Sequence, residues 1–115
     1  MSSETIRHLF EIVDARRWDD LELVFHPDVV YERPGYDPLT GFKAVDDFYR
    51  NRRVIARGSH MVEGIAVEGQ YGAAWGRFVG AKADNTPVDE RWADVYTFDG
   101  NKIRTRRSHF FRPAV

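Results

Sequence analysis

The segment that decides the fold covers residues 90–98 and reads Glu90-Arg91-Trp92-Ala93-Asp94-Val95-Tyr96-Thr97-Phe98. Side chains alternate between the two faces of a β-strand, so the even-numbered residues share one face. That face carries three large aromatic side chains together with Asp94, and an aromatic face normally packs inward. A carboxylate within such a face must be paired, hydrogen-bonded, protonated or placed at the wall of a cavity. Asp94 is therefore the first candidate for chemistry.

The composition predicts one soluble globular domain over residues 1–115. The residues are 43% hydrophobic and 14% aromatic, which excludes a disordered chain. The 17 basic and 18 acidic residues give a net charge of -1, so we expect no nucleic-acid partner. No apolar run reaches the length of a membrane span, and the first residues do not read as a secretory signal. We therefore expect a cytoplasmic protein with no membrane partner.

The first half of the sequence predicts three helices. Apolar residues recur at helical spacing over residues 6–13, which is typical of an amphipathic helix. A short second helix is expected from Asp19 or Asp20 to Pro27. The third follows Gly41, and its apolar stripe is expected to hold Val45, Phe48, Tyr49 and Arg52. Between the last two helices, residues 29–33 predict a short strand.

From residue 59 onward the sequence predicts strands. Alternation and turn residues place these strands at residues 59–68, 71–83, 88–98 and 102–112. Helices followed by a long antiparallel meander indicate an α+β domain, with three N-terminal helices packed against a strongly curved, mixed, mainly antiparallel sheet. Glycines spaced four apart in the second of these strands are expected to relieve crowding and to let the sheet bend.

This order of elements resembles the nuclear transport factor 2-like superfamily, which includes ketosteroid isomerases and SnoaL-like polyketide cyclases. The resemblance covers nearly the whole chain. It is carried by the motif at residues 31–35, by the helix that contains Phe48 and Tyr49, and by the motif at residues 94–98 with the turn after it. It implies a cone-shaped sheet that encloses a cavity.

The resemblance also assigns functional positions residue by residue. Asp94 falls where ketosteroid isomerases hold a neutral carboxylic acid that donates a hydrogen bond to the substrate oxygen. Arg33 replaces the general-base Asp of those enzymes, and Leu9 replaces their oxyanion-hole Tyr. Ser108 stands where limonene epoxide hydrolases place an Asp. Neither mechanism transfers intact to this chain.

The family's register implies a different set of polar side chains in the cavity. By that register Trp75 and Arg77 face the cavity from one strand, Arg106 and Ser108 face it from the last strand, and His60 faces it from the first long strand. Alternation alone does not define the faces of these three strands, because both faces mix polar and apolar residues.

A nearby guanidinium favours the ionised form of a carboxylate. If Arg77 or Arg106 lies beside Asp94, we expect Asp94 to be ionised and able to accept a proton from a substrate. An arginine could then stabilise a developing enolate or alkoxide. His60, with an ordinary pKa of about 6.5, could return the proton. The alternative is a purely structural ion pair for Asp94, with His60 as a hydrogen-bonded core residue.

The other candidates are expected to contact the substrate. Trp92 and Tyr96 are core aromatics that also present surface to the cavity. Tyr36 lies in a loop bounded by proline and glycine, where it could cap the cavity mouth. The further substrate-binding candidates are Arg33, Arg77, Arg106, Trp75 and Ser108. The four histidines are scattered through separate elements and no cofactor motif is present, so we expect neither a metal nor an organic cofactor.

Two functional classes fit these features. The first is a cofactor-independent acid–base enzyme, of isomerase, cyclase, dehydratase or epoxide-opening type, acting on a hydrophobic polyketide- or terpenoid-like molecule. The second is a non-catalytic small-molecule-binding or dimeric assembly domain, because one fold serves many functions. The resemblance also implies a homodimer formed through the outer face of the sheet, where Val95, Ile103 and Phe111 are expected.

Overall fold

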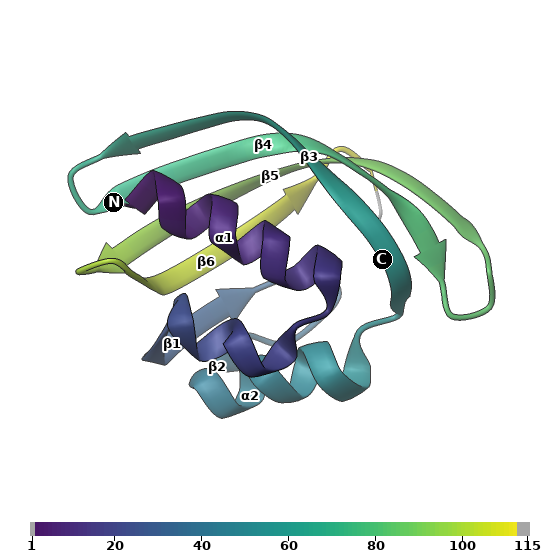
Figure 1. Ribbon diagram of the computed structural model, residues 1–115, viewed down its shortest axis with the longest axis horizontal. Coiled ribbons are helices and arrows are strands. Elements are labelled where there is room, and N and C mark those ends of the chain that lie inside the picture. The colour runs from purple at the N-terminus through teal and green to yellow at the C-terminus, as the bar shows by residue number, and fades with distance from the viewer. Residues whose placement is uncertain (1, 113–115) are drawn as a thin grey trace.

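The computed structural model describes residues 2–112 and confirms the α+β class, with helices packed on one side of a sheet (Figure 1). In chain order the elements are α1 (Ser2–Ala15), the 3-10 helix η1 (Trp18–Leu23), β1 (Phe25–Glu32), β2 (Leu39–Thr40), α2 (Phe42–Asp47), the π-helical turn η2 (Phe48–Arg52), β3 (Ile55–Glu68), β4 (Tyr71–Lys82), β5 (Pro87–Asp99) and β6 (Lys102–Phe110).

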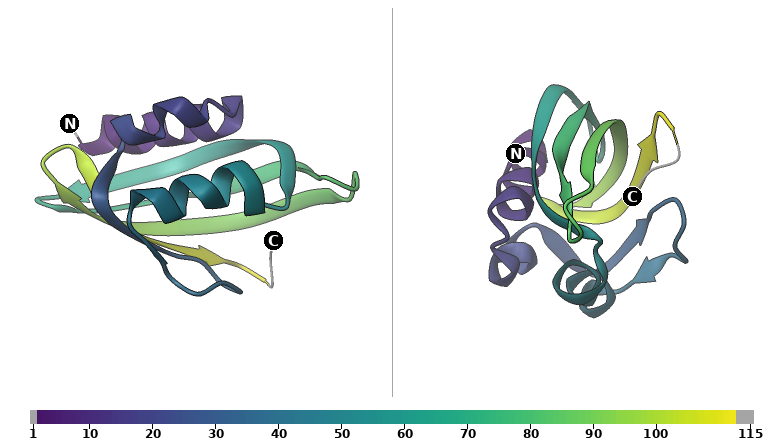
Figure 2. Two further views of the ribbon diagram at one scale, coloured as in Figure 1. Left: turned by 90° about the horizontal axis from the view of Figure 1, so that it is seen from below. Right: turned by 90° about the vertical axis from the view of Figure 1, so that its right-hand side faces the viewer.

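The six strands form one sheet in the order β2-β1-β6-β5-β4-β3. Only the pairing of β1 with β6 is parallel, so the sheet is mixed and mainly antiparallel, as predicted. The sheet bends, and α1 and α2 lie on its concave side (Figure 2). It is an open sheet with β2 and β3 at its edges, and the closed cone implied by the resemblance stays an expectation.

The helical half differs from the prediction of three helices. α1 forms where the apolar spacing predicts it and buries Ile6, Leu9 and Val13. The expected second helix is only the short η1, and β1 begins at Phe25 and runs through Pro27. The strand tolerates this proline because the pairing of β1 with β6 is interrupted between Phe25 and Val30, where no ladder hydrogen bond is lost.

The third helix changes its winding part of the way along. α2 continues into the π-helical turn η2, where the backbone N–H of Arg53 donates to the Phe48 carbonyl at 2.8 Å. Val45, Phe48 and Tyr49 are buried as expected, but Arg52 is exposed. A π-helical turn holds an extra residue. Counting at α-helical spacing therefore places Arg52 on the buried face, whereas in the structure Arg53 turns toward the concave side of the sheet.

The register of β4 decides which side chains face inward. β4 pairs Ala74 with Asp94 and Phe78 with Glu90, and residues directly opposite in an antiparallel pair share a face. The even-numbered residues of β4 therefore face the concave side, and Trp75 and Arg77 point outward. Their expected position in the cavity is wrong: Trp75 is 43% exposed and Arg77 pairs with Asp89 on the surface.

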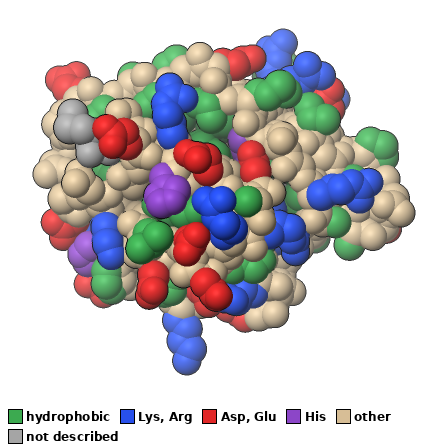
Figure 3. All heavy atoms as spheres, viewed as in Figure 1, with side chains coloured by type: hydrophobic (Ala, Val, Ile, Leu, Met, Phe, Trp, Pro, Cys, Tyr) green, Lys and Arg blue, Asp and Glu red, His purple; other side chains and the backbone are tan. Residues whose placement is uncertain are grey.

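The surface matches the balanced charge of the sequence. Acidic and basic side chains are interspersed on the face shown in Figure 3. Within residues 2–112, no helix is both long enough and apolar enough to cross a membrane.

Two glycines of β4, Gly76 and Gly80, lie against neighbouring backbone, in line with the expectation that they relieve crowding. A Cβ atom at Gly76 would lie 1.9 Å from the Met61 carbonyl oxygen, and one at Gly80 would lie 2.2 Å from the Arg57 carbonyl oxygen. β3 has a register irregularity between Val62 and Gly64, near Gly76 in the pairing. The two strands approach closely here because glycine carries no side chain.

We expect Gly76→Ala to lower the free energy of unfolding by about 1–3 kcal/mol, because the new methyl group meets backbone that cannot turn aside. The measurement is urea denaturation followed by circular dichroism. Val79→Ala, at an exposed site of the same strand, is the control and is expected to change stability by less than about 0.5 kcal/mol. Equal stability of the two variants would contradict the packing argument.

Candidate functional site

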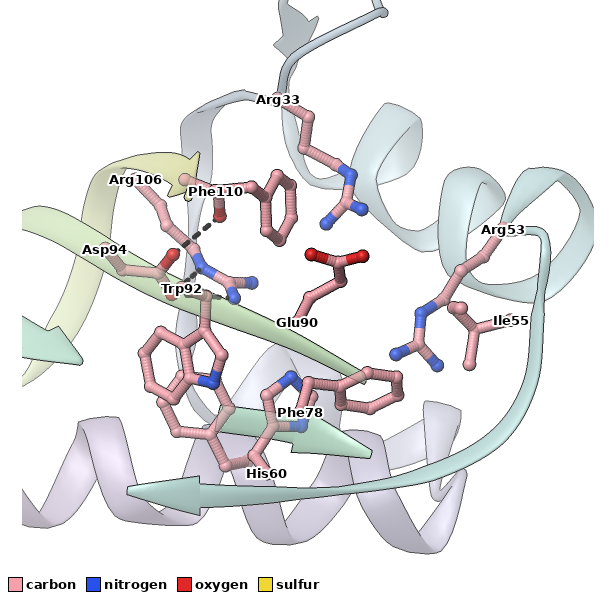
Figure 4. Close-up of a pocket in the computed structure, with 12 residues that line it drawn as sticks. Arg33, Arg53, Ile55, His60, Phe78, Glu90, Trp92, Asp94, Arg106 and Phe110 are labelled. Atoms are coloured by element: carbon pink, nitrogen blue, oxygen red, sulfur yellow. Dashed lines mark hydrogen bonds and ion pairs between the residues drawn. The ribbon is translucent and has the colours of Figure 1, made fainter. Parts of the chain in front are cut away.

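A small pocket opens on the concave side of the sheet, between α1, the end of η2 and strands β3 to β6 (Figure 4). Its enclosed volume is about 30 Å³, far below the roughly 300–1,000 Å³ of sites that hold drug-sized ligands. Its lining mixes aromatic and charged side chains. They are Phe10, Arg33, Arg53, Ile55, His60, Phe78, Glu90, Trp92, Asp94, Arg106, Ser108 and Phe110.

The floor of the pocket is a buried ion pair between Asp94 and Arg106. The Arg106 Nε and Nη2 atoms lie 3.0 and 2.9 Å from Asp94 Oδ2, and both side chains are at most 5% exposed. Tyr96 donates to the same oxygen at 2.8 Å. The third guanidinium nitrogen, Nη1, donates to the Tyr49 hydroxyl at 2.7 Å. The polar groups of this pair are thus matched within the protein.

A chain of hydrogen bonds ends on the other carboxylate oxygen. Ser108 Oγ donates to Asp94 Oδ1 at 2.6 Å, so the Tyr31 hydroxyl, 2.8 Å from Ser108 Oγ, donates to that serine. Arg33 Nη1 in turn donates to the Tyr31 oxygen at 2.8 Å. The direction of each bond follows from the carboxylate, which can only accept when ionised.

These contacts decide how well Asp94 fits the role expected for it, which is to accept a proton from a substrate. An ionised carboxylate offers about four acceptor positions, and Asp94 receives one hydrogen bond at Oδ1, two at Oδ2 and a further ion-pair contact of Oδ2 with Arg106 Nη2. Oδ2 is fully used by Arg106 and Tyr96, and within residues 2–112 one acceptor position remains on Oδ1, beside the Ser108 hydroxyl. The geometry therefore favours the structural ion pair with Arg106 over a role for Asp94 as a base.

The charge of Arg106 is stabilised within the protein. Burial opposes the charged form, but the Asp94 carboxylate and the nearby phenol groups together outweigh this effect and hold the pKa of Arg106 well above its usual range. The guanidinium also lies over the Tyr31 ring, 4.4 Å from its centroid. Arg106 is a fixed positive charge at the floor of the pocket.

His60 is held from outside the pocket by Asp14 of α1. Its Nδ1 lies 2.5 Å from Asp14 Oδ1, and its backbone N–H donates to Asp14 Oδ2 at 2.8 Å. Since the carboxylate only accepts, the ring proton sits on Nδ1 and the lone pair of a neutral ring sits on Nε2. Figure 4 shows Nε2 turned toward the pocket. This nitrogen is a proton acceptor of defined orientation.

The surroundings of His60 keep its ring neutral. Burial lowers the pKa of His60, and the positive charges of Arg53 and Arg106 lower it further, while Asp14 only partly opposes these effects. Phe10 and Phe78 flank the ring, each with a centroid 4.6 Å away. A neutral imidazole near pH 7 can act as a general base.

Two charged side chains reach the pocket from its rim. Arg53 follows η2 and lies over the rings of Tyr49 and Phe78, at 5.7 and 5.8 Å from their centroids. Glu90 of β5 points into the same space in Figure 4 and is paired with Arg112 at 2.9 Å. Burial lowers the pKa of Arg53, although an arginine remains charged at any physiological pH.

The structure brings together most of the expected site residues. Asp94, Arg106, Ser108 and Trp92 line the pocket with His60 and Arg33. Tyr96 lies behind Asp94 and donates to it. Tyr36 packs edge-on against Phe48 with Arg52 over its ring, and it is not among the pocket-lining residues. Trp75 and Arg77 lie on the opposite face of the sheet.

Sequence reasoning missed Asp14, Arg53 and Glu90 as parts of the site. Asp14 directly follows the apolar stripe of α1, and its partner lies 46 residues away, so no local pattern links them. Arg53 reaches the pocket because of the π-helical turn, which the apolar spacing of the sequence does not predict. Glu90 lies on the face shared with Asp94, so the alternation of residues 90–98 contained this signal.

Among residues 2–112, no group of three or more His, Asp or Glu side chains is arranged to hold a metal ion. The Trp92 indole N–H is buried at the pocket wall and has no hydrogen-bond partner in the described part of the chain. An unpaired buried donor is uncommon and calls for an explanation, and this one borders the space that a ligand would enter.

The family model for the SnoaL-like domain matches residues 6–106. No curated protein sequence matches the chain. Among solved structures, a candidate SnoaL-like polyketide cyclase from Jannaschia sp. CCS1 is 17% identical with a TM-score of 0.84, covering 96% of this chain and 85% of that one.

Two further structures share the fold. An epoxide hydrolase of M. tuberculosis that resembles limonene epoxide hydrolase is 15% identical with a TM-score of 0.81, covering 93% of this chain and 80% of that one. A protein of unknown function from Burkholderia pseudomallei, similar to nuclear transport factor 2, is 18% identical with a TM-score of 0.86, covering 95% and 89%. At these identities the likeness concerns the fold alone.

We expect Asp94→Asn to lower the free energy of unfolding by about 3–5 kcal/mol, because Arg106 then keeps a buried charge without its counter-ion. Urea denaturation measures this loss. Arg77→Gln removes one partner of an exposed ion pair and serves as the control, with a denaturation midpoint close to that of the unaltered protein. A stable Asp94→Asn variant would show that the ion pair is not needed to hold the floor of the pocket.

Proposed function

Because this chain belongs to the SnoaL-like domain family, we propose that it is a cofactor-independent acid–base enzyme of the isomerase, cyclase or dehydratase type. Its substrate is a small apolar molecule of polyketide or terpenoid kind that carries a carbonyl group. The observation that carries the proposal is the His60 ring, which Asp14 orients with Nε2 toward the pocket. Solved structures named for polyketide cyclases and for an epoxide hydrolase share the fold.

In the proposed reaction, His60 Nε2 removes a proton from the carbon next to the substrate carbonyl. The electron pair of the broken C–H bond moves toward the carbonyl oxygen and forms an enolate. The fixed charge of Arg106 and the charge of Arg53 stabilise this anion. The proton on Nε2 is then returned to another carbon, which isomerises the substrate, or to a leaving hydroxyl group, which departs as water.

The size of the pocket limits the substrate. About 30 Å³ accommodates only a few water-sized groups, so a molecule as large as a fused-ring polyketide enters only if lining side chains move. The proposal therefore favours the small end of the substrate class.

The alternative is a non-catalytic binding or assembly domain. The ion pair and hydrogen bonds that hold Asp94, together with the small pocket, favour this second function. The two candidates differ at His60. A binding domain needs its shape and polarity, whereas an enzyme needs its proton-accepting nitrogen.

We also propose a homodimer, formed through the outer face of the sheet. Val95 and Phe111 are 40% and 77% exposed there, whereas Ile103 is fully buried in the core and does not belong to this face. Tyr71 and Trp75 are exposed as well. A two-fold dimer would cover this apolar surface from both copies.

We expect His60→Gln to reduce proton transfer by at least about a hundredfold, because general-base catalysis typically contributes about 10²–10⁴. The assay follows deuterium exchange at the acidic carbon of small β-keto esters and enones in D₂O by proton NMR. Asp94→Asn, if folded, is expected to retain more activity than His60→Gln. Exchange catalysed equally by the unaltered protein and His60→Gln would remove His60 from the mechanism.

The rate is also expected to depend on pH through His60. Since burial lowers its pKa below the ordinary value of 6.5, the imidazole stays neutral and active above that value. The value of kcat/KM should therefore be constant near neutrality and fall as the pH drops through an apparent pKa below 6.5. An acid limb at or above 6.5 would mean that His60 is not the group titrated.

For the dimer, we expect sedimentation equilibrium at micromolar concentration to give twice the chain mass of 13.4 kDa. Val95→Asp places a charge in the proposed interface and should produce the monomer, while Arg77→Gln at an ordinary surface position leaves the mass unchanged. A monomeric unaltered protein would argue against the interface.

A further inference from the structure

The charges that face the pocket do not balance. Two carboxylates face it, Asp94 and Glu90, and each already pairs with an arginine, Arg106 and Arg112, at 2.9 Å. Arg33 also faces this space, and so does Arg53 (Figure 4). Within residues 2–112 no carboxylate lies within ion-pair distance of its guanidinium.

The partly buried charge of Arg53 costs free energy, because no carboxylate within residues 2–112 pairs with it. The side chain is half-buried between the rings of Tyr49 and Phe78, and it makes no side-chain hydrogen bond to the described part of the chain beyond these ring contacts. A guanidinium offers five N–H donors in a planar fork, which matches the two oxygens of a carboxylate. The two rings lie against the Arg53 guanidinium at the rim of the pocket.

We infer that the pocket takes a small carboxylic acid in its ionised form, with Arg53 as the residue that binds the carboxylate. The apolar part of the acid then lies among Phe78, Phe110 and Trp92, within reach of His60. This inference deepens the proposed function, on which it rests, because it names the substrate class of the same pocket.

Binding of an anion at Arg53 has a consequence for His60. The positive charge of Arg53 is one of the causes that lower the pKa of His60, and a carboxylate on Arg53 cancels part of that charge. By reciprocity, the protonated form of His60 binds the anion more tightly than the neutral form. Affinity for a carboxylate should therefore rise as the pH falls from 8 to 5, through the lowered pKa of His60, in a range in which carboxylates stay largely ionised.

Other charged groups near His60 do not reverse the direction in which carboxylate affinity changes with pH. They are Arg7, Glu11 and Asp14 on α1, Arg33 after β1, Glu90 and Asp94 on β5, and Arg106 on β6. Among ordinary side chains only an imidazole changes its charge between pH 5 and 8. The pH dependence of binding thus reports on His60 and on the anion beside it.

The test uses benzoate as the probe and benzamide as its neutral isostere. Titration calorimetry with the unaltered protein should give affinity for benzoate at least tenfold higher than for benzamide, increasing from pH 8 to pH 5 for benzoate only. Equal affinity for the two compounds, or an affinity for benzoate that does not change with pH, would overturn the inference. This measurement requires no variant and no turnover.

Two matched variants locate the charge. Arg53→Met keeps the apolar stem and should weaken benzoate binding at least tenfold, while Arg52→Met removes the neighbouring exposed arginine and should leave it unchanged. Arg53→Lys keeps the charge and should retain part of the affinity if Arg53→Met fails to fold. Equal binding by the Met and Lys variants at position 53 would overturn the assignment.

The benzoate-binding test can fail independently of the proton-transfer test of the proposed function. Benzoate binding through Arg53 combined with unchanged proton transfer in His60→Gln would refute the base and leave the carboxylate site standing. Loss of proton transfer in His60→Gln, with no preference for benzoate over benzamide, would refute the carboxylate site alone.

Discussion

The buried ion pair between Asp94 and Arg106 is the constraint on which the concave side of the molecule depends. Both side chains are almost fully removed from water, and a buried charge that lacks its partner costs several kcal/mol. Every contact that satisfies the pair is therefore held in place: Ser108 on β6, Tyr96 on β5 and Tyr49 at η2. The pair ties the end of the helical half to the centre of the sheet.

The buried ion pair forms the floor of the pocket, and His60 lies on the opposite side of the pocket. The floor holds a permanent positive charge whose donors are already occupied, so it shapes the electrostatic field and does not exchange protons. His60 lies across the pocket, with Asp14 behind it and positive charges in front of it. Burial, together with the charges of Arg53 and Arg106, lowers the pKa of the imidazole, and the proposed reaction uses the same two arginines to stabilise the anion that the base generates.

Much of the sheet and part of the site follow from local pattern. Alternation over residues 90–98 places Trp92, Asp94 and Tyr96 on one buried face, and the structure confirms it. The resemblance correctly brings Arg106 and Ser108 to Asp94. The faces of β4 cannot be obtained this way, because Trp75 and Arg77 alternate as regularly as their neighbours. Only the register against β5 turns them outward.

The sequence by itself determined the α+β class, the position of the meander and the carboxylate at the centre of an aromatic face, because each of these depends on spacing within a few residues. The tertiary structure alone decided which groups meet. It brought Asp14 to His60, 46 residues away, and a π-helical turn brought Arg53 rather than Arg52 to the pocket. Such contacts depend on packing between distant elements and on one irregular turn, and neither leaves a periodic signal in the sequence.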